Sequence, residues 1–359
     1  MAIFVVSDIH GHARAFGRAL ELAQPGSDDT VFVLGDMVDR GPDPLGVIDI
    51  VRALPNVRVL MGNHEEMLYE SLESGDERDK LTWHMNGGYT TYEQLEQLPR
   101  DRYVDVMDWL VNLPTFAVVE VDDRRPSAVR GDRRSYLLAH AGVDAPRLRA
   151  SLDALGVSYS EAAGYAAATP DDLLSAMIEQ DVSDLLWIRR EFWSTPTGLV
   201  GTSGLGPVVV AGYTPSISMS RYASLMCGPG VDEDLRGVMV EVGCSRDTGG
   251  VADRVCIDCS AAAGHPSGRV GIMRLEDRRV WLADIEEAAL RGRHAPERLY
   301  AWNGERFFSD RSCLMRWYSI DSRTRSMTIE ARYPATAPVR PVSQMSAVGT
   351  TRENAKVIA

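Results

Sequence analysis

The sequence has few cysteines and an excess of negative charge. Its 359 residues include five cysteines, an odd number, and all of them lie at Cys227 or later. This pattern argues against the disulfide framework of a secreted protein. The formal net charge of -13 argues against broad binding to phosphate backbones, so no nucleic-acid partner is expected.

Long apolar segments are also missing. No run is long enough to span a membrane, and Met1–Val6 has the pattern of a strand instead of a signal peptide. We therefore expect a cytoplasmic protein with no membrane partner. With 45% hydrophobic and 25% charged residues, the composition is that of a globular protein.

Residues 1–75 alternate between apolar strands and amphipathic helices. Strands are predicted at the N-terminus, at Val31–Leu34 and at Val57–Met61, and helices are predicted between them. Such alternation predicts a parallel sheet covered by helices. Farther along, 116–121 and 135–140 have the pattern of a hairpin that begins a second sheet.

Polar residues follow these apolar strands in three short segments. Asp8 and His10 follow the first strand, Asp36 follows the second, and Asn63 and His64 follow the third. Each segment alone is also typical of an ordinary turn. On an extended backbone, Asp8 and His10 would point to the same side. Since parallel strands end at one edge of a sheet, we expect these ligands to gather there and to bind two metal ions.

The three segments resemble the signature Asp-x-His, Gly-Asp-x-x-Asp-Arg-Gly and Gly-Asn-His-Glu of the calcineurin-like metallophosphoesterases, and specifically the bacterial branch related to Ser/Thr protein phosphatases. The resemblance covers 1–216 and resumes around 257–275. It implies an α/β sandwich of two mixed β-sheets flanked by helices. Further matching segments are Trp83–Gly88, Leu138–Val143, Leu185–Trp193 and Val208–Pro215.

The same resemblance implies a set of metal ligands. Asp8 and His10 would bind the first metal, Asp36 would bridge, and Asn63 and His140 would bind the second. Two divalent ions are expected, with manganese first and iron or zinc as alternatives. A hydroxide bridging the metals would attack the phosphorus.

Catalytic and phosphate-binding roles are implied as well. His64 would be the general acid, and Asp39 would orient its imidazole and keep it protonated near neutral pH. Arg40 and Arg189 would bind the non-bridging phosphate oxygens together with Asn63. The neighbouring Arg190 is an alternative to Arg189.

The sequence departs from the family pattern at Tyr213. The family has Gly-His-Thr-Pro, whose histidine completes the second metal site, whereas this chain has Gly-Tyr-Thr-Pro at 212–215. We therefore expect a weakened second site. The segment 257–261, Ile-Asp-Cys-Ser-Ala, also lacks a glycine that the family usually has. Cys256 and Cys259 are interpreted as buried thiols of a strand.

The predicted metallophosphoesterase domain covers 1–288 and includes an inserted flap at 217–254, in which 238–242 could form a strand. A C-terminal extension is expected at 289–359. Within it we expect strands at 299–302, 314–320 and 327–333, and a disordered tail from 334.

These observations predict a metal-dependent phosphoesterase that hydrolyses phosphomonoesters. The favoured substrate is a protein phosphorylated on serine or threonine. A dinucleoside polyphosphate such as diadenosine tetraphosphate is the enzymatic alternative. Tyr213 motivates a third hypothesis, a degenerate phosphatase that binds a phosphorylated partner without hydrolysing it.

Overall fold

A computed structural model of the chain describes residues 1–125, 132–286, 300–302 and 305–307. The chain separates into two units, one of Met1–Glu287 with Thr350–Ala359 and the other of Ala288–Gly349. In the second unit the structure describes an antiparallel hairpin of β11 (Tyr300–Trp302) and β12 (Glu305–Phe307). β11 falls within the predicted strand at 299–302. The strands predicted at 314–320 and 327–333, and the tail from 334, lie outside the described residues.

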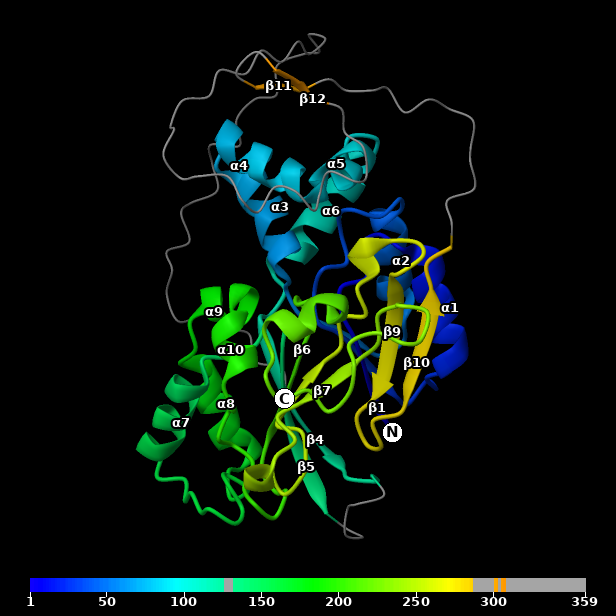
Figure 1. Ribbon diagram of the computed structural model, residues 1–359. Coiled ribbons are helices and arrows are strands. Elements are labelled where there is room, and N and C mark those ends of the chain that lie inside the picture. The colour runs from blue at the N-terminus through cyan, green and yellow to red at the C-terminus, as the bar shows by residue number, and fades with distance from the viewer. Residues whose placement is uncertain (126–131, 287–299, 303–304, 308–359) are drawn as a thin grey trace. The chain divides into compact units, whose positions relative to one another are not determined.

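The first sheet has the order β10-β9-β1-β2-β3 (Figure 1). The three strands that come first in the sequence, β1, β2 and β3, pair in parallel, as predicted. The later strands β9 and β10 join the sheet antiparallel. The helices α1 (Ala13–Ala23) and α2 (Pro44–Ala53) connect the parallel strands. The strand bounds are β1 Ile3–Val6, β2 Thr30–Val33, β3 Val57–Val59, β9 Arg269–Arg274 and β10 Val280–Asp284.

The second sheet has the order β4-β5-β6-β8-β7 and mixes parallel with antiparallel pairs. Val5 and Phe32 of the first sheet share a buried core with Leu138, Val210 and Val255 of the second. The two sheets therefore pack face to face, and the predicted sandwich is confirmed. The strand bounds are β4 Phe116–Asp122, β5 Arg133–Ala139, β6 Val208–Ala211, β7 Val240–Val242 and β8 Arg254–Cys256.

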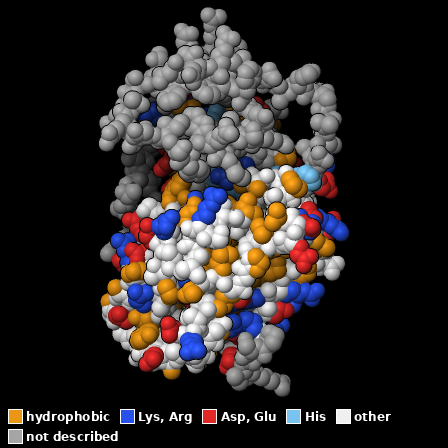
Figure 2. Space-filling view, in the orientation of Figure 1, with side chains coloured by type: hydrophobic (Ala, Val, Ile, Leu, Met, Phe, Trp, Pro, Cys, Tyr) orange, Lys and Arg blue, Asp and Glu red, His pale blue; other side chains and the backbone are white. Residues whose placement is uncertain are grey.

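Helices cover the outer faces of both sheets (Figure 1). Between β3 and β4 the chain forms a helical segment made of α3 (Asn63–Glu73), α4 (Glu77–Trp83), the π-helix η1 (His84–Gly88), α5 (Tyr89–Leu95) and α6 (Arg100–Val111). The helices of the second sheet are α7 (Ala145–Ala154), α8 (Pro170–Ile178), α9 (Val182–Trp187) and α10 (Arg190–Ser194). Over the described residues in Figure 2, basic side chains lie among acidic ones.

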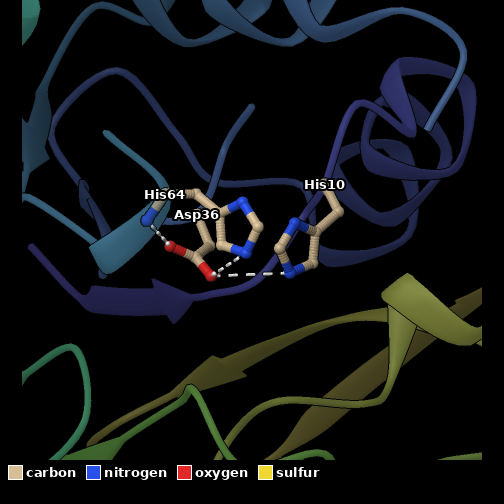
Figure 3. A group of neighbouring side chains, drawn as sticks. All are labelled: His10, Asp36 and His64. Carbon is tan, nitrogen blue, oxygen red and sulfur yellow. Dashed lines mark hydrogen bonds and ion pairs between the residues drawn. The ribbon is translucent and has the colours of Figure 1, made fainter. Parts of the chain in front are cut away.

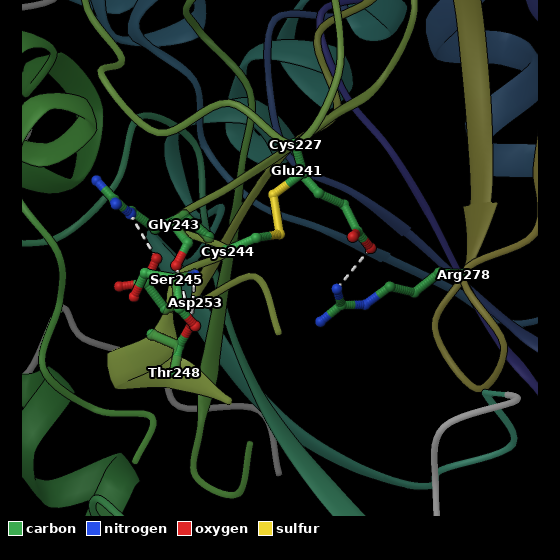
Figure 4. Close-up of a disulfide and its surroundings, with 9 residues drawn as sticks. Cys227, Glu241, Gly243, Cys244, Ser245, Thr248, Asp253 and Arg278 are labelled. Atoms are coloured by element: carbon green, nitrogen blue, oxygen red, sulfur yellow. Dashed lines mark hydrogen bonds and ion pairs between the residues drawn. A yellow bond between two sulfur atoms is a disulfide. The ribbon is translucent and has the colours of Figure 1, made fainter. Parts of the chain in front are cut away.

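Residues 217–254 contain little regular structure. They hold most of η2 (Ser216–Arg221), the edge strand β7 and η3 (Arg246–Thr248). A disulfide joins Cys227 to Cys244 beside β7, with an S–S distance of 1.92 Å (Figure 4). No disulfide framework is present among the described residues, but this single bond was not anticipated from the sequence. Cys256 and Cys259 are free and buried, as predicted. In the described part of the chain, no helix is long and apolar enough to cross a membrane.

Arg254 anchors the interior strand β8 to α10 and to the residue that follows it. Its side chain is 1% exposed and pairs with Asp253 at 2.9 Å. Its Nη1 donates to the carbonyls of Phe192, Trp193 and Thr195 at 2.7, 3.0 and 2.7 Å. A buried charge of this kind is stabilising only while all of its partners are present.

We expect Arg254→Met to lower the free energy of unfolding by about 3–5 kcal/mol, because it leaves a buried carboxylate unpaired. Urea denaturation measures this loss. Arg102→Met is the matched control, since Arg102 and Asp49 form an exposed pair at 2.6 Å and its loss should cost less than about 1 kcal/mol. Equal losses in the two variants would contradict the assigned anchoring role.

Candidate metal centre

Loops at the ends of four strands bring the predicted metal ligands together. Asp8 and His10 follow β1, Asp36 follows β2, Asn63 follows β3, and His140 follows β5. The Nε2 atom of His10 lies 3.5 Å from Asp36 Oδ2 and 4.0 Å from Asp8 Oδ1. On the other side, His140 Nε2 lies 3.4 Å from Asp36 Oδ1 and 2.9 Å from Asn63 Oδ1. All five side chains are buried, and Figure 3 shows how Asp36 faces His10.

Backbone carbonyls fix the orientation of both imidazoles. His10 Nδ1 lies 3.1 Å from the Val38 carbonyl, and His140 Nδ1 lies 2.8 Å from the Leu34 carbonyl. Because a carbonyl only accepts, each Nδ1 carries a proton, and the Nε2 atom of each ring is turned toward Asp36. Nε2 of His140 also faces the amide oxygen of Asn63 at 2.9 Å, so the two atoms could bind one cation together.

The ligand loops have unusual backbone geometry. Asp8, His10 and Asp36 have positive φ angles of 53°, 46° and 53°. Asp8 and His10 therefore reach the same site through left-handed turns, and the expectation that an extended backbone aligns them was wrong. Non-glycine residues rarely adopt this conformation, and its cost of about 1–3 kcal/mol each is typical of functional sites.

Glu65 holds two of these loops in place. Its buried carboxylate accepts hydrogen bonds from the backbone N–H of Asp36 and of Met37 at 2.8 Å, and from Gly62 at 2.9 Å. Gly62 is needed because a Cβ there would lie 2.3 Å from Asp36 Oδ1. Sequence reasoning missed this role. The available signal was a glutamate at the third position of α3, where it can form a capping box.

The electrostatics of the centre favour a bound cation. Burial, together with the nearby Asp8 and Glu65, raises the pKa of Asp36 well above its usual value. Burial and the charge of Asp8 also raise the pKa of Asp258, which follows β8 and was not among the predicted site residues. A divalent cation among these carboxylates would favour their ionised forms. Carboxylate, amide and neutral imidazole donors suit Mn²⁺, Fe²⁺ or Zn²⁺.

Asp39 orients His64 from outside the ligand cluster. Its Oδ2 lies 2.6 Å from His64 Nδ1 and accepts a hydrogen bond from Trp83 Nε1 at 2.8 Å. Its Oδ1 accepts from Thr91 Oγ1 at 2.6 Å. Burial raises the pKa of Asp39 to about 7. Trp83 and Thr91 belong to α4 and α5, so the helical segment after β3 sets the position of the imidazole.

Arg40 changes the expected protonation of His64. Its Nη2 lies 2.8 Å from His64 Nε2, and its Nη1 lies 3.0 Å from His10 Nε2. A guanidinium only donates, so Nε2 of His10 and Nε2 of His64 both accept. His64 therefore holds its proton on Nδ1, toward Asp39. Burial and the charge of Arg40 lower the pKa of His64 well below its usual value. The expectation that Asp39 keeps His64 protonated near neutral pH is therefore wrong for this structure.

Tyr213 and Arg189 lie together at the edge of the centre. The Tyr213 N–H donates to Asp8 Oδ2 at 2.9 Å, and its ring centroid is 5.6 Å from that of His140. The Cζ atom of Arg189 lies 4.1 Å from the Tyr213 ring centroid, whereas Arg190 is exposed. The structure thus places Tyr213 beside Asp8 and His140, two of the residues predicted to bind metal.

Comparison with curated proteins gives matches to symmetrical bis(5'-nucleosyl)-tetraphosphatases. The protein from Erwinia tasmaniensis is 28% identical over 148 residues, which are 40% of this chain and 45% of that protein. The protein from Wigglesworthia glossinidia brevipalpis is 35% identical over 91 residues, 24% of this chain and 34% of that protein. The matches therefore span less than half the length of these relatives.

Two solved structures resemble the chain at low identity. A putative diadenosine tetraphosphatase has a TM-score of 0.44 and 16% identity, and the match covers 80% of this chain and 94% of that one. A protein serine/threonine phosphatase from Saccharomyces cerevisiae has a TM-score of 0.45 and 13% identity, with 80% and 81% covered.

The family model for calcineurin-like phosphoesterases matches residues 1–236, which is more than half of the chain and includes all five predicted metal ligands. The site geometry agrees with this match, since it gathers carboxylates, an amide and imidazoles that could hold metal ions. The chain belongs to the calcineurin-like phosphoesterase family.

Proposed function

We propose that the chain hydrolyses phosphoesters at this centre, with Asp36 as the ligand shared by two metal ions. The observation that carries the proposal is the position of the Asp36 carboxylate. Its Oδ2 faces His10 at 3.5 Å and its Oδ1 faces His140 at 3.4 Å, so each oxygen is turned to a different set of ligands. A carboxylate in this position can hold two cations close together.

The proposed first site consists of Asp8, His10 and Asp36, and the second of Asp36, Asn63 and His140. Manganese is the proposed metal, with iron and zinc as alternatives. When bound, the metals supply Lewis-acid charge and lower the pKa of a water molecule toward neutrality.

The chain's own residues bind the substrate and move a proton. Arg40 and Arg189 bind the non-bridging phosphate oxygens, to which Asn63 also contributes. When a phosphate takes the hydrogen bonds of Arg40, Nε2 of His64 is released, and the negative charge of the phosphate favours its protonation. His64 then gives the proton from Nε2 to the departing oxygen while Asp39 holds Nδ1 at 2.6 Å.

The proposed substrate class is a dinucleoside polyphosphate. The curated relatives carry this activity in their names, and an aromatic surface lies near the centre. Trp187 is 39% exposed, is fixed by a 2.6 Å hydrogen bond from its indole N–H to Glu66, and lies edge-to-face with Tyr213 at 6.1 Å. A fixed and exposed indole suits stacking with a nucleobase.

A phosphoprotein is the second candidate, supported by the sequence resemblance to the Ser/Thr phosphatase branch. The degenerate-phosphatase hypothesis is less well supported, because the residues proposed for proton transfer and phosphate binding are present and close together. Turnover of diadenosine tetraphosphate, a phosphopeptide and p-nitrophenyl phosphate distinguishes the three hypotheses.

We expect Asp36→Asn and His64→Asn each to lower kcat by about a hundredfold or more, because they remove a metal bridge and a general acid. Steady-state kinetics on the best of the three substrates measures this effect. Asp49→Asn, an exposed change on α2, is the control and should keep the native rate. Near-native turnover by either site variant would contradict its assigned role.

Burial of Asp36 and Asp258 should make the metal-free protein less stable as the pH rises. Their folded-state pKa values are raised, so the stability that they contribute is present at low pH and is lost as the pH rises through these values. The lowered pKa values of His10 and His64 act in the opposite sense, because the unfolded imidazoles bind protons below about pH 6.5. Melting temperatures of the native protein and of Asp36→Asn at pH 6 and pH 8, with a chelator, isolate the carboxylate contribution, since the loss of stability attributable to Asp36 should be absent from the variant. Mn²⁺ should oppose it by binding the ionised carboxylates, and an unchanged pH trend with Mn²⁺ would contradict metal binding at this site.

We expect Tyr213→His to tighten binding of the more weakly held Mn²⁺ by about tenfold or more, because it adds a fourth protein ligand to the second site. Isothermal titration of both proteins with Mn²⁺ measures the change. Two tight sites in the native protein, weakened by the substitution, would instead show that tyrosine is itself a ligand.

A further inference from the structure

The backbone of Tyr213 is fixed against the metal centre. Its N–H donates to both carboxylate oxygens of Asp8 at 3.1 and 2.9 Å, and its φ is 62°. The preceding Gly212 donates its N–H to the His140 carbonyl at 2.7 Å. A Cβ at Gly212 would lie 2.0 Å from Asp8 Oδ2, so only glycine allows the backbone to approach Asp8 this closely. The ring of Tyr213 therefore leaves the backbone from a defined point.

Other aromatic rings hold the Tyr213 ring in place. Trp187 contacts it edge-to-face at 6.1 Å, and the indole N–H of Trp187 is bonded to Glu66 at 2.6 Å. Glu66 lies on α3, the helix that begins with Asn63 and His64. The position of the Tyr213 ring is thus coupled to the same helix that presents these two site residues.

The Arg189 guanidinium lies on this ring. Its Cζ is 4.1 Å from the Tyr213 centroid and 5.5 Å from that of Tyr222, and its Nη2 donates to the Tyr213 carbonyl at 3.3 Å. Within the described part of the chain, its Nε is buried and has no hydrogen-bond partner. No described carboxylate lies within ion-pair distance of Arg189. The aromatic faces thus hold the charge, and the Nε–H is left without an acceptor.

We propose that Tyr213 is a positioning residue whose ring holds Arg189 for binding phosphate oxygens; this inference rests on the proposed function. A metal-bound histidine at this position would bring positive charge close to the guanidinium. The face of a phenol ring carries partial negative charge and attracts it. With tyrosine in place of histidine, the position gives up a metal ligand and instead holds the phosphate-binding Arg189. The group bound by Arg189 is a phosphate with free non-bridging oxygens.

Binding of inorganic phosphate to the Mn²⁺-loaded protein tests this role. By isothermal titration, Tyr213→Leu should weaken phosphate binding about fivefold to thirtyfold, the range of a desolvated cation–π contact, whereas Tyr213→Phe should stay within about twofold. The matched control is Trp109→Leu, which removes a remote cation–π contact with Arg52 at 5.5 Å and should leave phosphate affinity unchanged. Mn²⁺ affinity, titrated separately, should be the same in the native protein and in Tyr213→Phe.

A double-mutant cycle assigns the effect to Arg189. In an Arg189→Ala background, Tyr213→Leu should cause no further loss of phosphate affinity. The proposal is overturned if Tyr213→Phe weakens Mn²⁺ binding, which would make the hydroxyl a ligand, or if Tyr213→Leu acts equally with and without Arg189. Phosphate binding that depends on the ring in a protein that hydrolyses none of the three phosphoesters would support this inference and overturn the proposed function.

Discussion

The structure of the centre depends on placing one buried carboxylate between two sets of metal ligands. Asp36 must reach toward His10 and His140 at once, and its burial among other acidic groups makes its ionised form costly. Positive φ angles at Asp8 and Asp36 add backbone strain. The three backbone hydrogen bonds that Glu65 accepts hold the strained loops in place. The Asp36 carboxylate itself is stabilised by the backbone N–H of His64, which donates to its Oδ1 at 3.0 Å. Cations bound at the proposed sites would favour the ionised carboxylates and so complete the compensation.

The orientation of the proposed general acid, His64, depends on the helical segment after β3. Asp39 contacts His64 directly, but Asp39 itself is held by Trp83 and Thr91 from α4 and α5. Trp83 is only 1% exposed, and a Cβ at Gly88 would lie 2.4 Å from its indole, so the π-helix η1 packs closely against it. Displacement of these helices would therefore change the orientation of His64 without touching any metal ligand.

Much of the centre could be predicted because its ligands directly follow strands in the sequence. The positions of Asp8, Asp36 and Asn63 required only the rule that parallel strands end at one edge of a sheet. The roles of Glu65, Trp83 and Asp258 could not be predicted in this way, because they depend on which distant segments pack together. The protonation of His64 was predicted wrongly for the same reason, since it depends on where the Arg40 guanidinium lies. The Cys227–Cys244 bond belongs to a segment with little periodic pattern, where sequence reasoning had no basis for pairing the cysteines.

The tyrosine at position 213 does more than remove a metal ligand. It changes which groups supply positive charge to a bound phosphate. Without a histidine, the proposed second site has one fewer protein ligand, and more of the charge that attracts a phosphate would have to come from the protein. Arg189 can supply that charge because two aromatic rings hold it without neutralising it, in contrast to an ion pair with a carboxylate. Arg40 contacts other residues of the centre, His10 and His64. A phosphate bound between the two guanidiniums would release His64 from Arg40, so substrate binding itself would prepare the proton donor.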